Sequence, residues 1–188
     1  MPRPKQPQQY YDDIIAKFRD ARNLRLGYRP PGTDQFISEL SGDLSKYAVD
    51  PYAADVPDRA PITDEVEVLL IGGGFSALLT SARLRERGIK GVRIVERGSD
   101  VGGTWYWNRY PGAACDVVSY DYLPLLDELD YVPVNHYSRG PEIFGHCQAI
   151  AHKYNLYDLA VFNTTVTETR WNETDQLWHV KTDRGDVM

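Results

Sequence analysis

The strongest hydrophobic pattern in this sequence lies between positions 66 and 96. Val66–Ile71 is a short, mostly apolar run rich in β-branched residues, which predicts a β-strand. Helical periodicity begins at Phe75 and stops at Gly88, and a second apolar run, Val92–Val95, predicts another strand. The pattern therefore predicts a strand–turn–helix–strand unit at the start of an α/β domain.

The residues before this unit predict an arm. Apolar side chains recur at helical spacing over Tyr10–Leu26, which predicts an amphipathic helix after a Pro- and Gln-rich start that we expect to be disordered. A short helix fits Phe36–Leu40 before several prolines break the chain. We place the arm at 1–61 and the domain at 62–188. Packing against the domain or a partner subunit is favoured for the arm over a role as a tunnel cover.

The pattern after position 140 predicts a helix, a strand and a hairpin. Pro141 stands near the first turn of the helix, which we expect to end near Asn155. Val161–Thr167 predicts a strand, and Thr169–Trp171 with Leu177–Thr182 predicts the hairpin. The fold class is thus α/β, a three-layer, Rossmann-like domain with a β-hairpin and an N-terminal helical arm.

We expect this domain to be incomplete. The first strand is apolar at nearly every position, as in a strand that is buried on both faces, and the doubly wound order gives it a neighbour on each side. The second neighbour should follow the hairpin, where the sequence ends. A long apolar strand edge then stays open, which favours association with another chain.

Composition excludes some classes of partner and location. The 188 residues carry a net charge of −6 without a basic cluster, so we expect no nucleic acid and no membrane as partner. The start lacks the apolar segment of a secretory signal, and Cys115 and Cys147 are the only cysteines. We expect a cytoplasmic protein with reduced thiols.

The turn between the first strand and the helix has the residues of a dinucleotide site. Gly72 allows the chain to turn tightly, Gly74 lets the backbone approach a pyrophosphate, and Ala77 is small enough for close helix–strand packing. The phosphate would lie on the N-terminus of the helix. Glu96 ends the second strand, about 20 residues on, where an acid binds a ribose hydroxyl.

A second glycine turn identifies the kind of dinucleotide. Gly102–Gly103 is followed by four residues of which three are aromatic, and a nicotinamide domain has no evident use for such a loop. The string VGGTWYWNRYPGAACDV closely resembles the GGTWYWNRYPGxxCDxxS segment of class B flavoprotein monooxygenases of the Baeyer–Villiger type. A subgroup of that family also has a similar N-terminal arm.

The resemblance implies which residues hold each cofactor. Three of these residues also have a structural alternative to cofactor binding. Trp105 and Trp107 could be core aromatics, and Asp116 could be a turn residue or a helix cap. The corner approached by the nicotinamide of NADPH is implied to be Ala114, Cys115 and Asp116. The residues implied to hold FAD are Gly72, Gly74, Ala77, Glu96, Gly103, Thr104, Trp105, Tyr106, Trp107, Asp116 and Tyr122.

Some positions depart from the family pattern or carry no chemistry. Ala114 stands where many members have Arg, Val118 replaces a frequent Glu, and Asp121 replaces an apolar residue. Cys115 has no base paired with it in the sequence, so we interpret it as a small packed residue. The four histidines lack metal-ligand spacing, so no metal site is expected, and no catalytic residue is assigned.

The resemblance implies a monooxygenase that uses FAD as cofactor and NADPH as co-substrate. In a reaction that depends on NADPH and O₂, it would insert oxygen into a small-molecule ketone to give an ester or lactone, in secondary metabolism. Because we expect the chain to lack the NADPH domain, its partner would be a second polypeptide or a second copy bound through the open sheet edge. The alternatives are a non-catalytic flavin-binding or scaffold homologue and a nicotinamide-dependent dehydrogenase. The loop Gly102–Trp107 argues against the dehydrogenase.

Overall fold

The computed structural model of this chain describes residues 7–25, 49–53 and 55–188, which fall into two units, 1–48 and 49–188. In the first unit, α1 (Gln8–Arg25) confirms the predicted N-terminal helix. The expected short helix at Phe36–Leu40 and the predicted end at Leu26 lie outside the described residues. The boundary that we place between residues 61 and 62 stays a prediction.

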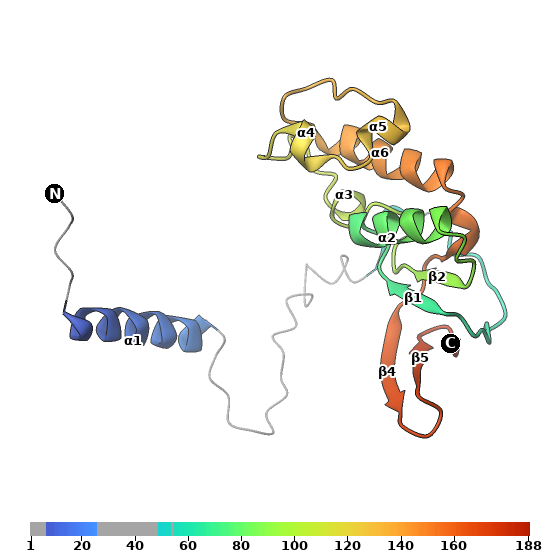
Figure 1. Ribbon diagram of the computed structural model, residues 1–188, viewed down its shortest axis with the longest axis horizontal. Helices are drawn as coiled ribbons and strands as arrows, with labels where there is room; N and C mark the ends of the chain where they lie inside the picture. Colours follow the sequence, from blue (N-terminus) through green and yellow to red (C-terminus); the bar gives the residue numbers. More distant parts are fainter. Residues whose placement is uncertain (1–6, 26–48, 54) are drawn as a thin grey trace. The chain divides into compact units, whose positions relative to one another are not determined.

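A parallel sheet forms the centre of the second unit (Figure 1). Its strands are β1 (Val68–Ile71), β2 (Val92–Val95) and β3 (Ala160–Val161), in that order across the sheet. Val68 lies opposite Val92, and Ile94 lies opposite Ala160. The predicted α/β fold with a parallel sheet is confirmed.

The connection between β1 and β2 follows from the sequence signals. Gly72 has a φ of +96°, which glycine adopts without strain, so the chain leaves β1 in a sharp turn. Helix α2 (Phe75–Glu86) begins there, and Gly88 with a φ of +77° ends it. The helix returns the chain to the start of β2, as a parallel crossover requires.

Helices α2 and α6 cover one side of the sheet, and their contact forms most of the core (Figure 1). Helix α6 (Gly140–Lys153) has Pro141 in its first turn, as predicted, but it ends before Asn155, which has a φ of +52°. No helix in the described part of the chain is long and apolar enough to cross a bilayer. The short helices, which the sequence reasoning missed, are α3 (Thr104–Trp107), α4 (Ser119–Tyr122), α5 (Leu126–Leu129) and η2 (Tyr157–Leu159).

The predicted strand at Val161–Thr167 is wrong in its extent. The chain forms β3 only to Val161, then turns at Asn163, which has a φ of +51°. The backbone N–H groups of Asn163 and Thr164 donate to carbonyls beyond the end of β2, which redirects the chain out of the parallel sheet. Strand β4 (Val166–Asn172) starts after this turn.

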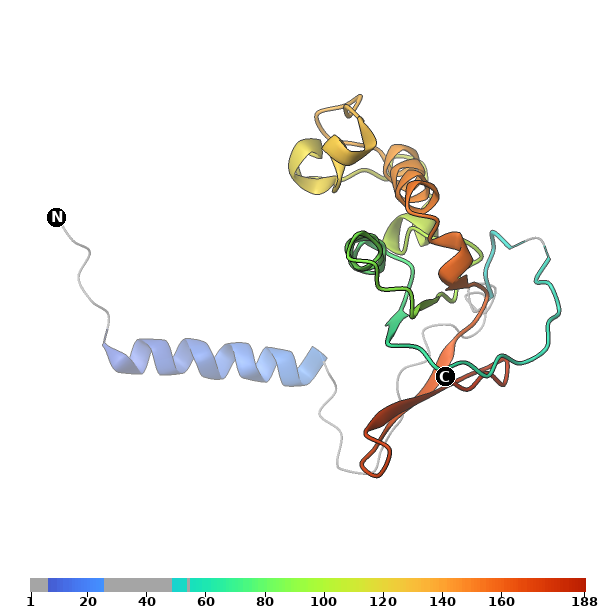
Figure 2. The same ribbon diagram turned by 45° about the vertical axis from the view of Figure 1, so that its right-hand side comes forward.

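The predicted hairpin is confirmed. It consists of β4 and β5 (Leu177–Thr182), which pair antiparallel with Trp171 opposite Trp178. The hairpin lies on the side of the sheet away from α2 and α6 (Figures 1 and 2).

A buried ion pair holds the end of the hairpin against the segment before β1. The carboxylate of Asp186 is fully buried and accepts hydrogen bonds from Arg59 at 2.6 and 2.7 Å, from the backbone of Ile62 at 2.8 Å and from Thr182 at 2.7 Å. The hydrogen bonds from Arg59 hold the pKa of this carboxyl well below its usual range. The pair thereby joins two segments that are distant in the sequence.

We expect Asp186→Asn to destabilise the second unit by about 3 kcal/mol. This is the low end for a broken buried pair, since Arg59 remains a quarter exposed. Because the folded-state pKa of Asp186 is lowered, its stabilisation is complete above about pH 3.9 and is lost as the pH falls below that value. Urea unfolding between pH 7 and pH 2 measures both effects, and the variant should lose stability less steeply in acid.

The control is Glu168→Gln, which removes the exposed ion pairs with Arg170 and Lys181 on the same hairpin. Such a pair contributes at most about 1 kcal/mol. Equal losses in the two variants would contradict the role of Asp186.

Candidate functional site

The two glycine turns of the sequence lie in direct backbone contact. The N–H of Gly102 donates to the carbonyl of Gly73 at 2.9 Å. At Gly103, which has a φ of +53°, a Cβ would lie 2.8 Å from the Cα of Gly74. A residue with a side chain does not fit at position 103, so this glycine allows two loops about 30 positions apart to come together.

Glu96 joins the end of β2 to the same contact. Its side chain is buried, and its carboxylate accepts a hydrogen bond from the N–H of Gly73 and one from the N–H of Gly98 at 2.6 Å. The acid therefore lies beside the first turn, where the sequence places it. Any Cβ at Gly73 would come within 3.0 Å of this carboxylate.

The N-terminus of α2 opens at this contact and fits a phosphate group. Gly74 is the N-cap, and no side chain caps the helix, so the N–H groups of its first turn are available to an anion. A Cβ on Gly72 would meet nothing within 4 Å, which leaves space in front of the turn. Ala77 is buried, as its expected packing role requires. These features suit a pyrophosphate held by backbone groups.

An aromatic cluster lies beside the helix start. The indole N–H of Trp105 donates to the hydroxyl of Tyr122 at 2.8 Å, and the ring of Tyr122 meets Phe75 edge-on at 5.6 Å between centroids. Burial raises the pKa of Tyr122. Two predicted cofactor residues, Trp105 and Tyr122, thus lie together and contact the first residue of α2.

The other members of α3 differ in exposure. Tyr106 is almost fully buried, while Thr104 is exposed and Trp107 is half-buried beneath the guanidinium of Arg97, 5.4 Å from the ring centroid. A Cβ at Gly98 would lie 2.7 Å from the ring of Tyr106. Tyr106 is thus placed as a core residue that supports the loop after Glu96.

The sequence reasoning missed the residues that hold Tyr106. Its hydroxyl donates to Asp50, and Asp50 also accepts from the N–H of Ser99 at 3.1 Å. The guanidinium of Arg109 lies over the rings of Tyr52 and Tyr106 at 4.1 and 4.5 Å from their centroids. The only signal in the sequence was the position of Arg109 in the NRYPG string, since Asp50 is more than 50 residues from its partner.

The predicted nicotinamide corner is fixed from one side. Ala114 forms an antiparallel bridge with Arg139, and the N–H of Cys115 donates to the carbonyl of Ser138 at 2.9 Å. Ala114 and Asp116 are exposed, whereas Cys115 is buried in the cluster that contains Trp105. Backbone hydrogen bonds therefore tie the corner to the start of α6.

The described residues offer no metal cluster, and burial keeps the thiol of Cys147 protonated. No group of three or more His, Cys, Asp or Glu side chains in 7–25, 49–53 and 55–188 lies close enough to hold a metal ion. Burial raises the pKa of Cys147 to about 12, so this thiol stays protonated at neutral pH.

Comparison with known proteins finds a Rossmann-like domain family and relatives that are monooxygenases or synthases. Residues 70–126 match the family described as NAD(P)-binding Rossmann-like domain. The chain is 51% identical over 176 residues to pentalenolactone D synthase of Streptomyces arenae, covering 93% of this chain and 29% of that protein. It is 45% identical over 175 residues to a Baeyer–Villiger monooxygenase of Streptomyces coelicolor, covering 93% and 28%. The chain thus spans less than a third of the length of these curated relatives.

Solved structures of monooxygenases are also similar to this chain. The polycyclic ketone monooxygenase of Thermothelomyces thermophila matches 93% of this chain and 30% of its own, with a TM-score of 0.68 and 32% identity. A steroid monooxygenase bound to NADP matches 67% of this chain and 24% of its own, with a TM-score of 0.60 and 37% identity.

The contact between the turns predicts that alanine at position 103 destabilises the protein more than alanine at position 88. Gly103→Ala introduces both a strained φ and a clash with Gly74, and we expect it to cost about 2–4 kcal/mol of unfolding free energy. Gly88→Ala has a positive φ but nothing within 4 Å of its Cβ, so its cost should stay near 1 kcal/mol. Urea unfolding of both variants tests this. A Gly103→Ala variant as stable as Gly88→Ala would contradict the close contact.

Proposed function

This chain belongs to the Baeyer–Villiger monooxygenase family as the counterpart of the N-terminal portion of its members, and from that premise we propose that it binds the adenosine and pyrophosphate half of FAD. The observation that carries the proposal is the backbone contact between Gly72–Gly74 and Gly102–Gly103 at the open N-terminus of α2. A single turn would suit any dinucleotide. The second turn adds a wall with aromatic residues, which suits the more extended FAD.

The proposed roles divide among the residues of the site. The first-turn N–H groups of α2 hold the pyrophosphate, with Gly72 and Gly74 leaving room for it. Glu96 accepts from a ribose hydroxyl while it keeps the N–H of Gly73 in place. Further along the cofactor, Trp105 and Tyr122 exclude water as a hydrogen-bonded pair. Gly103, Thr104, Trp107 and Asp116 are proposed contacts as well, and Ala77 and Tyr106 support the site through packing.

The proposed reaction is that of the family. When bound, FAD would supply the redox chemistry by which NADPH and O₂ oxygenate a ketone, with one oxygen atom entering the ester or lactone and the other leaving as water. The corner Ala114–Asp116 is proposed to meet the nicotinamide, since Ala114 and Asp116 are exposed and the corner is bonded to the segment before α6. The names of the relatives, which include pentalenolactone D synthase and ketocytochalasin monooxygenase of Aspergillus clavatus, support a role in secondary metabolism.

Titration with FAD and with NADP⁺ tests the choice of dinucleotide. We expect the purified chain to bind FAD at one site and at least tenfold more tightly than NADP⁺, because only FAD extends along the second turn. Isothermal calorimetry measures both affinities in the same buffer. Tighter binding of NADP⁺ would replace this proposal with a nicotinamide-binding domain, the function suggested by the matched domain family.

A substitution at the acid tests how FAD is held. Glu96→Gln replaces one charged acceptor by an amide, and a hydrogen bond to a charged group contributes about 1.5–3 kcal/mol, so FAD affinity should fall about 10- to 100-fold. Glu86→Gln is the matched control: Glu86 is an exposed residue of α2 paired with Arg83. We expect this variant to bind FAD like the unmodified chain. If the unmodified chain and both variants bound FAD with equal affinity, Glu96 would not be a residue that holds FAD.

A further inference from the structure

The segment 49–53 contacts α3, the helix that begins directly after the second glycine turn. The carboxylate of Asp50 accepts a hydrogen bond from the hydroxyl of Tyr106. The hydroxyl of Tyr52 donates to the carbonyl of Trp107 at 3.4 Å, and its ring meets that of Tyr106 edge-on with 5.7 Å between centroids. A segment more than 50 positions away thus holds two consecutive residues of α3.

Tyr106 connects this segment to the candidate site. Its N–H donates to the carbonyl of Gly103 at 3.0 Å, so Tyr106 is bonded directly to the second glycine turn. Its ring lies against Gly98, whose N–H donates to the carboxylate of Glu96 at 2.6 Å. A displacement of Tyr106 would therefore move both the second turn and the loop that bonds to Glu96.

The hydroxyl of Tyr106 requires a partner because the residue is only 1% exposed. Burial raises the pKa of Tyr106, and the hydrogen bond to Asp50 raises it further, so the hydroxyl stays protonated at neutral pH and can donate. The N–H of Ser99 donates to the same hydroxyl at 3.1 Å. Asp50 is the charged member of this group and therefore makes the strongest of its hydrogen bonds.

Asp50 is itself held in place by its own turn. One oxygen of its carboxylate accepts from the N–H of Tyr52 at 2.8 Å, the bond by which an aspartate stabilises a turn two residues on. The other oxygen accepts from the N–H of Ser99 at 3.1 Å. Pro51, between Asp50 and Tyr52, fixes a backbone angle of the same turn. The acceptor for Tyr106 is thus fixed before any ligand binds.

Arg109 completes the network. Its guanidinium lies over the rings of Tyr52 and Tyr106 at 4.1 and 4.5 Å from their centroids, a favourable contact between a cation and an aromatic face. Its Nε donates to the carbonyl of Tyr106 at 2.8 Å. The hydroxyl, the ring and the backbone of Tyr106 therefore each have a specific partner.

We propose that Asp50 is a positioning residue of the cofactor site, which holds the turn Gly102–Gly103 in place through the hydroxyl of Tyr106. Asp50 acts through Tyr106 and needs no contact with the cofactor. The arm, which we expect to pack against the domain, thereby has a function in the site. The effect of Asp50 on FAD affinity rests on the proposed function, whereas its effect on the turn does not.

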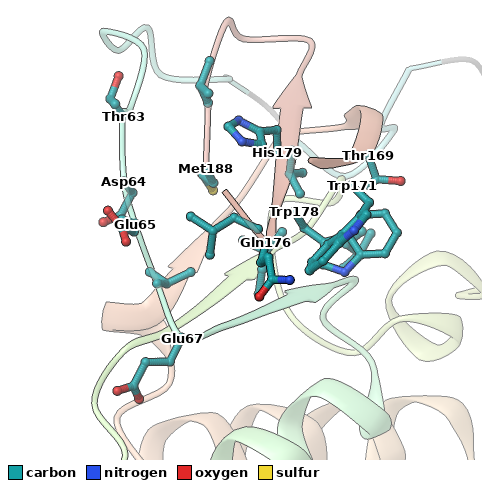
Figure 3. Close-up of a pocket in the computed structure, with 16 residues that line it drawn as sticks. Thr63, Asp64, Glu65, Glu67, Thr169, Trp171, Gln176, Trp178, His179 and Met188 are labelled. Carbon is teal, nitrogen blue, oxygen red and sulfur yellow. The ribbon is translucent and has the colours of Figure 1, made fainter. Parts of the chain in front are cut away.

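The four tryptophans of the chain allow a test without FAD. Trp105 and Trp107 belong to α3, whereas Trp171 and Trp178 lie side by side in the hairpin and line a groove of about 860 Å³ (Figure 3). None of the residues that line this groove belongs to the network around Asp50. We expect Asp50→Leu to shift the indole NMR signals of Trp105 and Trp107 and to leave those of Trp171 and Trp178 in place.

Amide hydrogen exchange of the same two proteins measures the turn itself. Because the N–H of Tyr106 donates to Gly103, we expect it to exchange about tenfold faster in Asp50→Leu. The N–H of Leu78, which donates to Gly74 in the first turn of α2, should change by less than about twofold. This comparison separates a local effect on the second turn from a loss of stability of the whole unit.

Titration with FAD then measures what the positioning contributes. We expect Asp50→Leu to weaken binding about tenfold, within the range of residues that act without contacting a ligand. Tyr106→Phe, which removes only the hydroxyl, should weaken binding equally, and the double variant should be no weaker than either, because both changes break one hydrogen bond. Asp50→Asn keeps an acceptor oxygen and should recover most of the affinity. Asp58→Leu, at an exposed carboxylate before β1, is the matched control and should bind normally.

Three results would overturn the proposal. The first is exchange at Tyr106 that Asp50→Leu leaves unchanged, or a shift of all four indole signals, which would indicate a general loss of structure. The second is FAD binding by Asp50→Leu that equals that of Asp58→Leu. The third is additive losses in the double variant, which would mean that Asp50 acts independently of Tyr106. An unmodified chain that bound no FAD would instead contradict the proposed function, and the NMR and exchange results would still decide whether Asp50 positions the turn.

Discussion

The contact between two glycine turns is the constraint on which the rest of the candidate site depends. Gly103 approaches Gly74 so closely that a Cβ at position 103 would not fit, and the N–H of Gly102 donates to the carbonyl of Gly73. Glu96 fixes the same point from β2. Because α2 starts at this contact and α3 follows the second turn, the contact determines where the first-turn N–H groups and the Trp105–Tyr122 pair lie relative to one another.

Much of the fold follows from local sequence patterns. The order strand, glycine turn, helix, strand and acid could be predicted because each signal lies within a few residues of the element that it specifies. The hairpin and the helix after Pro141 were predictable for the same reason. The identity of the second turn came from a long and unusual string of residues, which physical reasoning about periodicity could not have supplied.

The missed features all depend on distant partners or on a single backbone angle. Asp50 binds Tyr106, and Arg59 binds Asp186 across 127 positions, and neither pairing has a sequence signal. The run after Val161 has the composition of one strand, yet Asn163 adopts a positive φ because the turn bonds to the loop beyond β2. The roles proposed for Asp116 and for the Ala114–Cys115 corner stay predictions. The contacts around these residues define where they lie, but they do not show which ligand the residues bind.

The most direct measurement is an amide NMR titration of the chain with FAD, observed at Gly74, Phe75, Gly103 and Thr104. We expect the signals of both turns to shift together and to give one dissociation constant, because a single ligand would contact both loops. Shifts confined to one turn, or to the hairpin, would contradict it. They would mean that the two glycine turns meet for packing alone and do not form a shared site.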